Sequence, residues 1–241
     1  MRFPTPLIEA TFLRRYQRFL VDVRMADGAL ATVHCPNTGS MAGLLQEGAP
    51  CLLLDSQNPA RRLRYTMEAI RVGRTWVGAH PVMANVVGRE AIEQGLVEGL
   101  GPIESVRAEV AYGRGSRADL VVQERSGTTW YVEIKSASLA EGHTSMFPDA
   151  VTERGLKHLG ELTRVVRAGG RALMLFVATR DDVDRFRPAA HIDPAYAKGL
   201  WQAERAGVTL RALTSRTTRT QMRAMRAIPV EGRPGGKKAG A

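Results

Sequence analysis

The chain has 241 residues, of which 44% are hydrophobic, so it can bury the core of one large or two modest domains. Its two cysteines, Cys35 and Cys51, exclude a disulfide framework and a cysteine-based zinc site, and they indicate a reducing compartment. No apolar run approaches the roughly 20 residues that cross a bilayer, and the first residues lack the apolar core of a secretion signal. We therefore expect a cytoplasmic protein with no membrane partner.

The formal net charge of +10 is unevenly distributed along the chain. Residues 211–241 hold eight Arg and Lys against one Glu, which gives this segment +7 and leaves only +3 for the rest. Two explanations fit this distribution: a tail that binds a polyanion, or a disordered end that adds solubility. We favour the second. Net charge alone is therefore weak support for nucleic-acid binding.

Residues 1–82 contain short β segments separated by Gly, Pro and Asn. We predict five strands, at 19–25, 29–35, 50–55, 62–73 and 75–80. This number of strands in so short a region predicts a small barrel of the OB type, whose open face often binds single-stranded nucleic acid.

Residues 83–214 change to a mixed α/β (α+β) pattern that predicts a second domain. Apolar residues at helical spacing over 83–100 precede three strands, and further elements follow them in the order αβββαβαβ. The expected strands are 104–112, 117–124, 128–138, 172–180 and 208–213; the two later helices are 149–168, with Asp149 as N-cap, and 194–206. Residues 215–241 show no apolar periodicity, so we expect a basic, partly disordered tail.

Charged residues in the third strand of this domain suggest a metal site. Side chains alternate along a strand, so Glu133 and Lys135 share one face. Asp119 lies on the preceding strand, and the turn at Ser126 and Gly127 brings the two carboxylates to one end of a hairpin. Two carboxylates suit Mg²⁺ (or Mn²⁺), which prefers oxygen ligands and keeps several waters. Lys135 would then orient the attacking water or stabilise the transition state.

A Glu-x-Lys triplet by itself recurs by chance, and a solvated ion pair is its simplest explanation. With Asp119 upstream, the hairpin and the helix that follows, however, the pattern resembles the core of PD-(D/E)xK nucleases. Ala118 replaces the proline of that motif, which matters little because only the acid contacts the metal.

Longer strings resemble the sugar fermentation stimulation protein A (SfsA) family over nearly the whole chain. They are FLRRYQRFLVDV, HCPNTGSM, GSRADLVV, YVEIKSASL, FPDAVTERGLKHL and IDPAYAKGL. The resemblance implies an OB-like domain, a PD-(D/E)xK-like domain, non-specific DNA binding and a proposed part in the regulation of sugar (maltose) metabolism. It also matches Asp119, Glu133 and Lys135 to the nuclease motif one by one.

Several other residues are candidates for accessory roles. Many nucleases of this fold add an acid from the first helix, which could be Glu90 or Glu93, while Glu109 is a rival that we read as a surface acid. Glu153 and Lys157 share a helical face, as do Arg154 and His158, and either a place over the active site or a solvated pair fits. The five histidines show no metal-ligand spacing, so we expect structural roles for them.

The first domain offers a candidate nucleic-acid surface. Three guanidiniums and a stacking ring suit contact with a phosphate backbone, and small donors in a later loop could hold a phosphate. These residues are Arg14, Arg15, Tyr16 and Arg18, followed by Asn37, Thr38, Gly39 and Ser40. An ordinary basic turn and an ordinary loop are the alternatives.

Two hypotheses follow from the sequence. The first is a non-specific DNA-binding protein, with RNA as a second possible partner, that hydrolyses phosphodiesters at a Mg²⁺ site formed by Asp119 and Glu133. The second is a DNA-binding regulatory factor that keeps the nuclease scaffold without cutting. The sequence shows no helix-turn-helix pattern, so base-specific reading of an operator is not expected.

Overall fold

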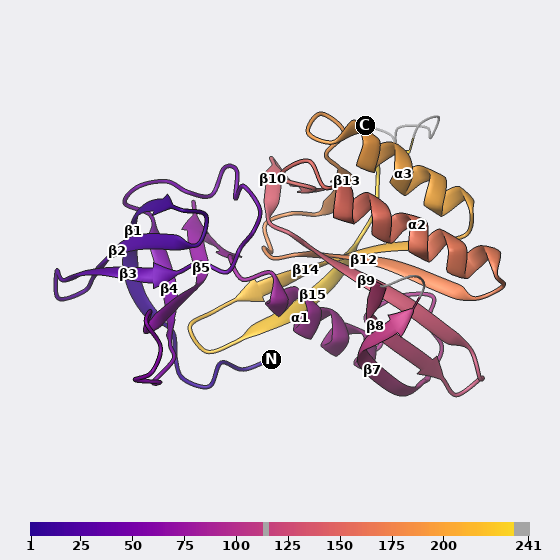
Figure 1. The fold of residues 1–241 in the computed structure, drawn as a ribbon, viewed down its shortest axis with the longest axis horizontal. Helices are drawn as coiled ribbons and strands as arrows, with labels where there is room; N and C mark the ends of the chain where they lie inside the picture. The colour runs from indigo at the N-terminus through magenta and orange to yellow at the C-terminus, as the bar shows by residue number, and fades with distance from the viewer. Residues whose placement is uncertain (113–115, 234–241) are drawn as a thin grey trace.

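The N-terminal strands form a sheet that closes on itself, at the left of Figure 1. The computed structural model describes residues 1–112 and 116–233. The first strands are β1 (Ile8–Tyr16), β2 (Leu20–Met25), β3 (Leu30–His34), β4 (Pro50–Asp55), β5 (Tyr65–Val72) and β6 (Thr75–Gly78). They lie in the order β3-β2-β1-β4-β5-β6, and a parallel bridge from His34 to Thr66 joins β3 to β5. Five strands therefore close a ring, which confirms the predicted OB-like barrel.

The membership of this ring differs from the prediction. β1 was not expected, whereas β6, which was, only extends the sheet beyond β5. Within β1, Ala10 and Phe12 are the buried residues, and a bulge between Phe12 and Arg14 interrupts the alternation of its side chains. The strand consequently has a weak apolar pattern, and the basic residues at its end are as typical of a turn as of a strand.

The second domain is a six-stranded sheet with helices on both faces (Figure 1). Its elements are α1 (Val82–Glu93), β7 (Ile103–Tyr112), β8 (Ser116–Glu124), β9 (Thr129–Ala137), α2 (Glu153–Arg167), β12 (Arg171–Ala178), α3 (Pro194–Arg205), β14 (Thr209–Thr217) and β15 (Met222–Ile228). The sheet order is β15-β14-β12-β9-β8-β7, with β12 parallel to both β9 and β14. The predicted order αβββαβαβ is confirmed.

Strand β12 separates two hydrophobic cores. Leu173 and Leu175 pack with α1, whereas Met174 and Phe176 pack with α2 and α3. Because both faces of β12 are covered, its sequence is a continuous apolar run, as predicted. Glu133 and Lys135 stand beside Met174 and Phe176 in the register of β9 with β12, and so project toward the α2 side.

Several elements were not expected. A small sheet contains β10 (Leu139–Glu141), β11 (Thr144–Phe147) and β13 (Arg185–Pro188). The prediction of a tail from residue 215 is wrong in part, because β14 continues to Thr217 and β15 pairs with it. As an edge strand with buried residues only at Met222 and Ile228, β15 lacks the apolar pattern of a core strand. The rest of that predicted tail, from residue 234, lies outside the described residues.

The two domains are joined by backbone hydrogen bonds as well as by the chain. Gly78 N–H at the end of the barrel sheet donates to the carbonyl of Thr179 just after β12, at 2.7 Å. Phe3 and Leu7 donate to the carbonyls of Thr220 and Arg219 in the β14–β15 hairpin. Over the described ranges, no helix has the length and apolar character needed to span a membrane.

Candidate active site

The hairpin of β8 and β9 brings the two predicted carboxylates into one pocket. Asp119 Oδ2 accepts a hydrogen bond from the backbone N–H of Ile134 at 2.7 Å, so its side chain reaches across to the strand that carries Glu133. Asn85 of α1 donates to the other oxygen of Asp119 at 3.2 Å. These two bonds fix the Asp119 carboxylate at the end of the hairpin where Glu133 lies.

Glu133 is a buried carboxylate, only 2% exposed. Its Oε1 accepts a hydrogen bond from Lys135 Nζ at 2.6 Å and contacts Nδ1 of His158. Burial by itself would raise the pKa of Glu133, but the hydrogen bond to His158 and the charge of Lys135 outweigh it and lower the pKa. Glu133 is therefore ionised at neutral pH although it is buried.

The pKa of Asp119 is shifted in the opposite direction. Burial and the neighbouring charge of Glu133 raise the pKa of Asp119 to about 6, in spite of the hydrogen bond from Ile134. Two carboxylates that resist being charged together are a favourable environment for a cation, which relieves their repulsion.

The pocket also fits a divalent cation in a second respect. Glu133 Oε2 is buried and has no hydrogen-bond partner in the protein, so one acceptor of an ionised carboxylate is left for another ligand. Within residues 1–112 and 116–233, no group of three or more His, Cys, Asp and Glu is arranged to hold a metal. Two carboxylates with water or substrate oxygens would suit Mg²⁺, which retains several waters.

For His158 the sequence left open both a structural role and a place over the active site together with Arg154, and the structure brings it into contact with Glu133. It lies on the buried side of α2 with Gly155 and Leu159, and its Nδ1 contacts Glu133. The signal available in the sequence was its spacing of four from Arg154, whose Nε donates to His158 Nε2 at 3.4 Å. Lys157 is exposed and does not line the pocket, whereas Glu153 does.

The acids proposed from the first helix do not reach the pocket. Glu90 binds the N-terminal ammonium of Met1 at 2.5 Å, and Glu93 forms an exposed pair with Arg89 at 2.8 Å. Asn85 lines the pocket and these two acids do not, so the first helix supplies an amide where we expected an acid. Glu109 is exposed on β7, and its charge adds slightly to the raised pKa of Asp119.

The barrel forms the opposite wall of the same pocket, which has a volume of about 600 Å³. The barrel residues that line it are Arg18, Asn37, Thr38 and Gly39. The other predicted basic residues are held elsewhere. Arg14 and the hydroxyl of Tyr16 both bind Asp22, at 2.8 and 3.0 Å.

Arg15 organises the loop that forms this wall. Its guanidinium donates to the carbonyls of Asn37 at 2.6 Å and Gly39 at 3.0 Å, and its Nε donates to the carbonyl of Arg18. Donors that bind backbone carbonyls in this way are engaged in holding the loop. Arg15 therefore shapes the wall, while Arg18 lines the pocket.

Asp149 connects the barrel loop to the sheet domain. It accepts hydrogen bonds from the Ser40 hydroxyl, at 2.7 Å on its carbonyl, and from Met41 N–H, at 2.9 Å on its carboxylate. A Cβ at position 39 would lie 2.5 Å from Asp149 Oδ2, so a larger residue there would displace the Asp149 carboxylate. The prediction that Asp149 caps α2 is wrong, since Thr152 is the N-cap and accepts from Gly155 N–H.

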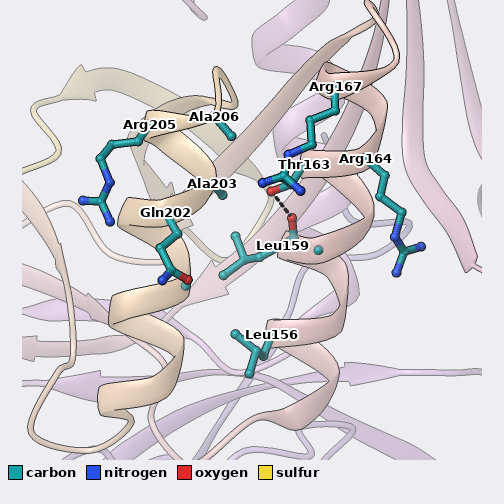
Figure 2. A pocket seen from close by; sticks show the side chains of 11 residues that line it. Leu156, Leu159, Thr163, Arg164, Arg167, Gln202, Ala203, Arg205 and Ala206 are labelled. Carbon is teal, nitrogen blue, oxygen red and sulfur yellow. Dashed lines mark hydrogen bonds between the residues drawn. The ribbon is translucent and has the colours of Figure 1, made fainter.

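A larger hollow, of about 780 Å³, lies between α2 and α3 (Figure 2). Arg164, Arg167 and Arg205 line it, and each stands in the last turn of its helix, where a cation favours the helix dipole. None of the carboxylates described above lines this hollow. The smaller pocket between the domains is therefore the candidate active site.

Comparisons with known proteins match the same family over nearly the whole chain. The SfsA N-terminal OB domain matches residues 13–79, and the sugar fermentation stimulation protein RE domain matches residues 82–221. A sugar fermentation stimulation protein homolog of Geobacter sulfurreducens is 47% identical, over 95% of this chain and 98% of its own. A sugar fermentation stimulation protein homolog of Maricaulis maris is 42% identical, over 96% of this chain and 99% of its own.

A solved structure matches as well. The structure of Pyrococcus furiosus SfsA in complex with Ca²⁺ superposes with a TM-score of 0.86 at 28% identity, and covers 96% of this chain and 98% of that one. With the two domain matches and the full-length relatives, this places the chain in the SfsA (sugar fermentation stimulation protein) family.

Proposed function

We propose that this protein binds DNA non-specifically and hydrolyses its phosphodiester bonds with the help of Mg²⁺ (or Mn²⁺) held by Asp119 and Glu133. The observation that carries the proposal is the buried, ionised Glu133, whose Oε2 has no partner in the protein and which lies beside Asp119 and Lys135. The Ca²⁺ in the structure of the Pyrococcus furiosus relative supports a divalent cation in this family.

Each residue of the site has a distinct part in this mechanism. Asn85 and the backbone of Ile134 hold the Asp119 carboxylate, and His158 with Lys135 holds Oε1 of Glu133, so that Oε2 stays available. When bound, the cation would lower the pKa of a water molecule and neutralise charge on the phosphate. The ammonium of Lys135 would stabilise the negative charge that develops on the phosphoryl oxygens during attack.

A non-catalytic DNA-binding factor is the second candidate. It is favoured by the absence, among the described residues, of a third acidic or histidine ligand beside Asp119 and Glu133. On this hypothesis the lysine and the acids would form a buried ion pair that serves the fold. In either case we propose action in the cytoplasm, with RNA as the alternative substrate and with sugar metabolism as the process served.

The test is a cleavage assay with labelled single-stranded DNA, duplex DNA and RNA in the presence of Mg²⁺, Mn²⁺ or EDTA. We expect metal-dependent cleavage that falls by about 10²–10³-fold in Glu133→Gln and Lys135→Ala, because the first removes a ligand charge for the cation and the second removes the charge that stabilises the transition state. Glu93→Gln is the matched control and should keep full activity, since Glu93 forms an exposed pair on α1. Salt-sensitive binding without cleavage by the unmodified protein would instead support the second candidate.

A further inference from the structure

We propose that Arg18 of the barrel is a phosphate-binding residue of the interdomain pocket, and that the pocket receives a single DNA strand in preference to a duplex. In this arrangement Arg18 contacts one backbone phosphate while another phosphodiester lies at Asp119 and Glu133. The part of this inference that concerns the position of the cut rests on the proposed function, whereas the part that concerns binding does not.

Arg18 differs from Arg14, which binds a carboxylate, and from Arg15, whose donors bind several carbonyls and which does not line the pocket. Nε and Nη2 of Arg18 both donate to the carbonyl of Thr38, at 3.2 and 3.0 Å, and this places the charge on the pocket wall. In the part of the chain that the structure describes, no carboxylate lies within ion-pair distance of Arg18, whereas Arg14 is paired with Asp22. A guanidinium oriented by a neutral carbonyl keeps its full charge for an anionic ligand.

The turn that carries Arg18 holds an uncommon backbone conformation. Gln17 and Arg18 have φ values of +44° and +64°, in the left-handed region that side chains other than glycine rarely occupy. Two successive residues in this region are sustained by surrounding contacts, here the bonds from Arg15 to the carbonyls of Arg18 and Asn37 and from Arg18 to the carbonyl of Thr38. Strained residues that are held in this way cluster at ligand sites.

Two carboxylates of the pocket already have donors from the protein, which reduces their repulsion of a phosphate. Asp149 is already bonded by Ser40 and Met41, and Glu133 by Lys135 and His158. The first turn of α2 also lines the pocket, and it carries the exposed Glu153 and Arg154, whose charges oppose each other. Arg18 and Arg154 therefore offer cationic contacts from both domains.

The shape of the pocket favours a single strand. Its volume of about 600 Å³ falls within the range of small-molecule sites, which suits a nucleotide or two and not a length of duplex. The bonds from Ser40 and Met41 to Asp149 hold the barrel wall against the sheet domain. Val82 and Val151 line the pocket while being 58% and 73% exposed, and they offer apolar surface to an unstacked base.

The experiment compares Arg18→Ala with Arg14→Ala, two exposed arginines at the same end of the barrel. Binding of a fluorescein-labelled oligothymidine and of a duplex of equal length is followed by anisotropy in Ca²⁺ over a range of salt. Arg18→Ala should weaken oligothymidine binding by about 5–10-fold and reduce the salt slope by about 0.7, the value for one phosphate contact with a single strand. Arg14→Ala should stay within about twofold of the unmodified protein.

Arg18→Gln separates charge from folding, because glutamine can still donate to the carbonyl of Thr38 and yet should lose the same affinity. Equal effects of the Arg14 and Arg18 variants, or duplex binding as tight as that of oligothymidine, would overturn the inference. If the Arg18 effect is found but the unmodified protein cleaves nothing in Mg²⁺ or Mn²⁺, the strand-binding site stands and the proposed nuclease activity fails. If duplex and single strand are cleaved at equal rates and Arg18→Ala does not change those rates, the proposed nuclease activity stands and the strand-binding site fails.

Discussion

The barrel and the sheet domain both contain ion pairs on or beside their strands, but they expose these pairs to solvent very differently. In the barrel, Arg14 and Arg64 pair with aspartates while their side chains remain 73% and 64% exposed. In the sheet domain, the side chains of Lys135 and Glu133 are 14% and 2% exposed. Burying an ion pair costs desolvation free energy that an exposed pair avoids, so the pair in the sheet domain calls for an explanation beyond stability.

The same difference separates the residues expected to bind DNA from those expected to act on it. Exposed guanidiniums can contact a phosphate backbone without special surroundings, because the contact is mainly electrostatic. A carboxylate that holds a cation needs a fixed position and few competing donors. In the barrel, the charge expected to give affinity is therefore that of Arg18, since Arg14 and Arg64 are paired with aspartates, whereas buried charge in the sheet domain predicts chemistry.

The largest expected effect comes from breaking one ion pair in each domain. Lys135→Met should lower the free energy of unfolding by about 3 kcal/mol, because Glu133 would then be buried with only His158 to compensate it. Arg64→Met should leave the unfolding midpoint nearly unchanged, since Asp55 can be solvated once its partner is removed. Urea unfolding of both variants measures the contrast, and equal midpoints would show that the buried pair is no different from a surface pair.

The next effect concerns the pH dependence of cation binding. Since the pKa of Asp119 is raised to about 6, its neutral form predominates below that pH and a cation must displace the proton. We expect the affinity for Ca²⁺ to fall about tenfold between pH 7.5 and pH 5.0, as measured by calorimetry. An aspartate with an ordinary pKa would produce almost no change over this interval. Asp119→Asn should abolish the dependence together with most of the affinity.

Much of the sheet domain could be predicted from the sequence because its signals are local. Alternation in β9, the turn at Gly127 and the apolar run of β12 each reflect neighbouring residues, and together they place Asp119, Glu133 and Lys135 in one pocket. Strands β1 and β15 lack such signals, since β1 is bulged and β15 is an edge strand with basic residues on its exposed positions.

Contacts between distant parts of the chain could not be predicted at all. The bonds of Asp149 to Ser40 and Met41 span more than a hundred residues, and they make the barrel loop a wall of the pocket. His158 reaches Glu133 because α2 packs on the face of β9 that carries Glu133, whereas its spacing of four from Arg154 fitted a solvated pair equally well. Long-range packing thus determines which of several similar acids and bases takes part in the site.

The smallest effect distinguishes the two residues that compete for the start of α2. Thr152→Ala should lower the free energy of unfolding by about 1 kcal/mol, because the side chain accepts the hydrogen bond from Gly155 N–H. In hydrogen exchange, this variant should expose the first turn of α2, whereas Asp149→Ala should expose residues 37–41 of the barrel loop. If Asp149→Ala increased exchange in α2 and left the loop protected, Asp149 would belong to the helix terminus and the barrel wall would need another anchor. The pocket would then depend on the barrel less than its lining suggests.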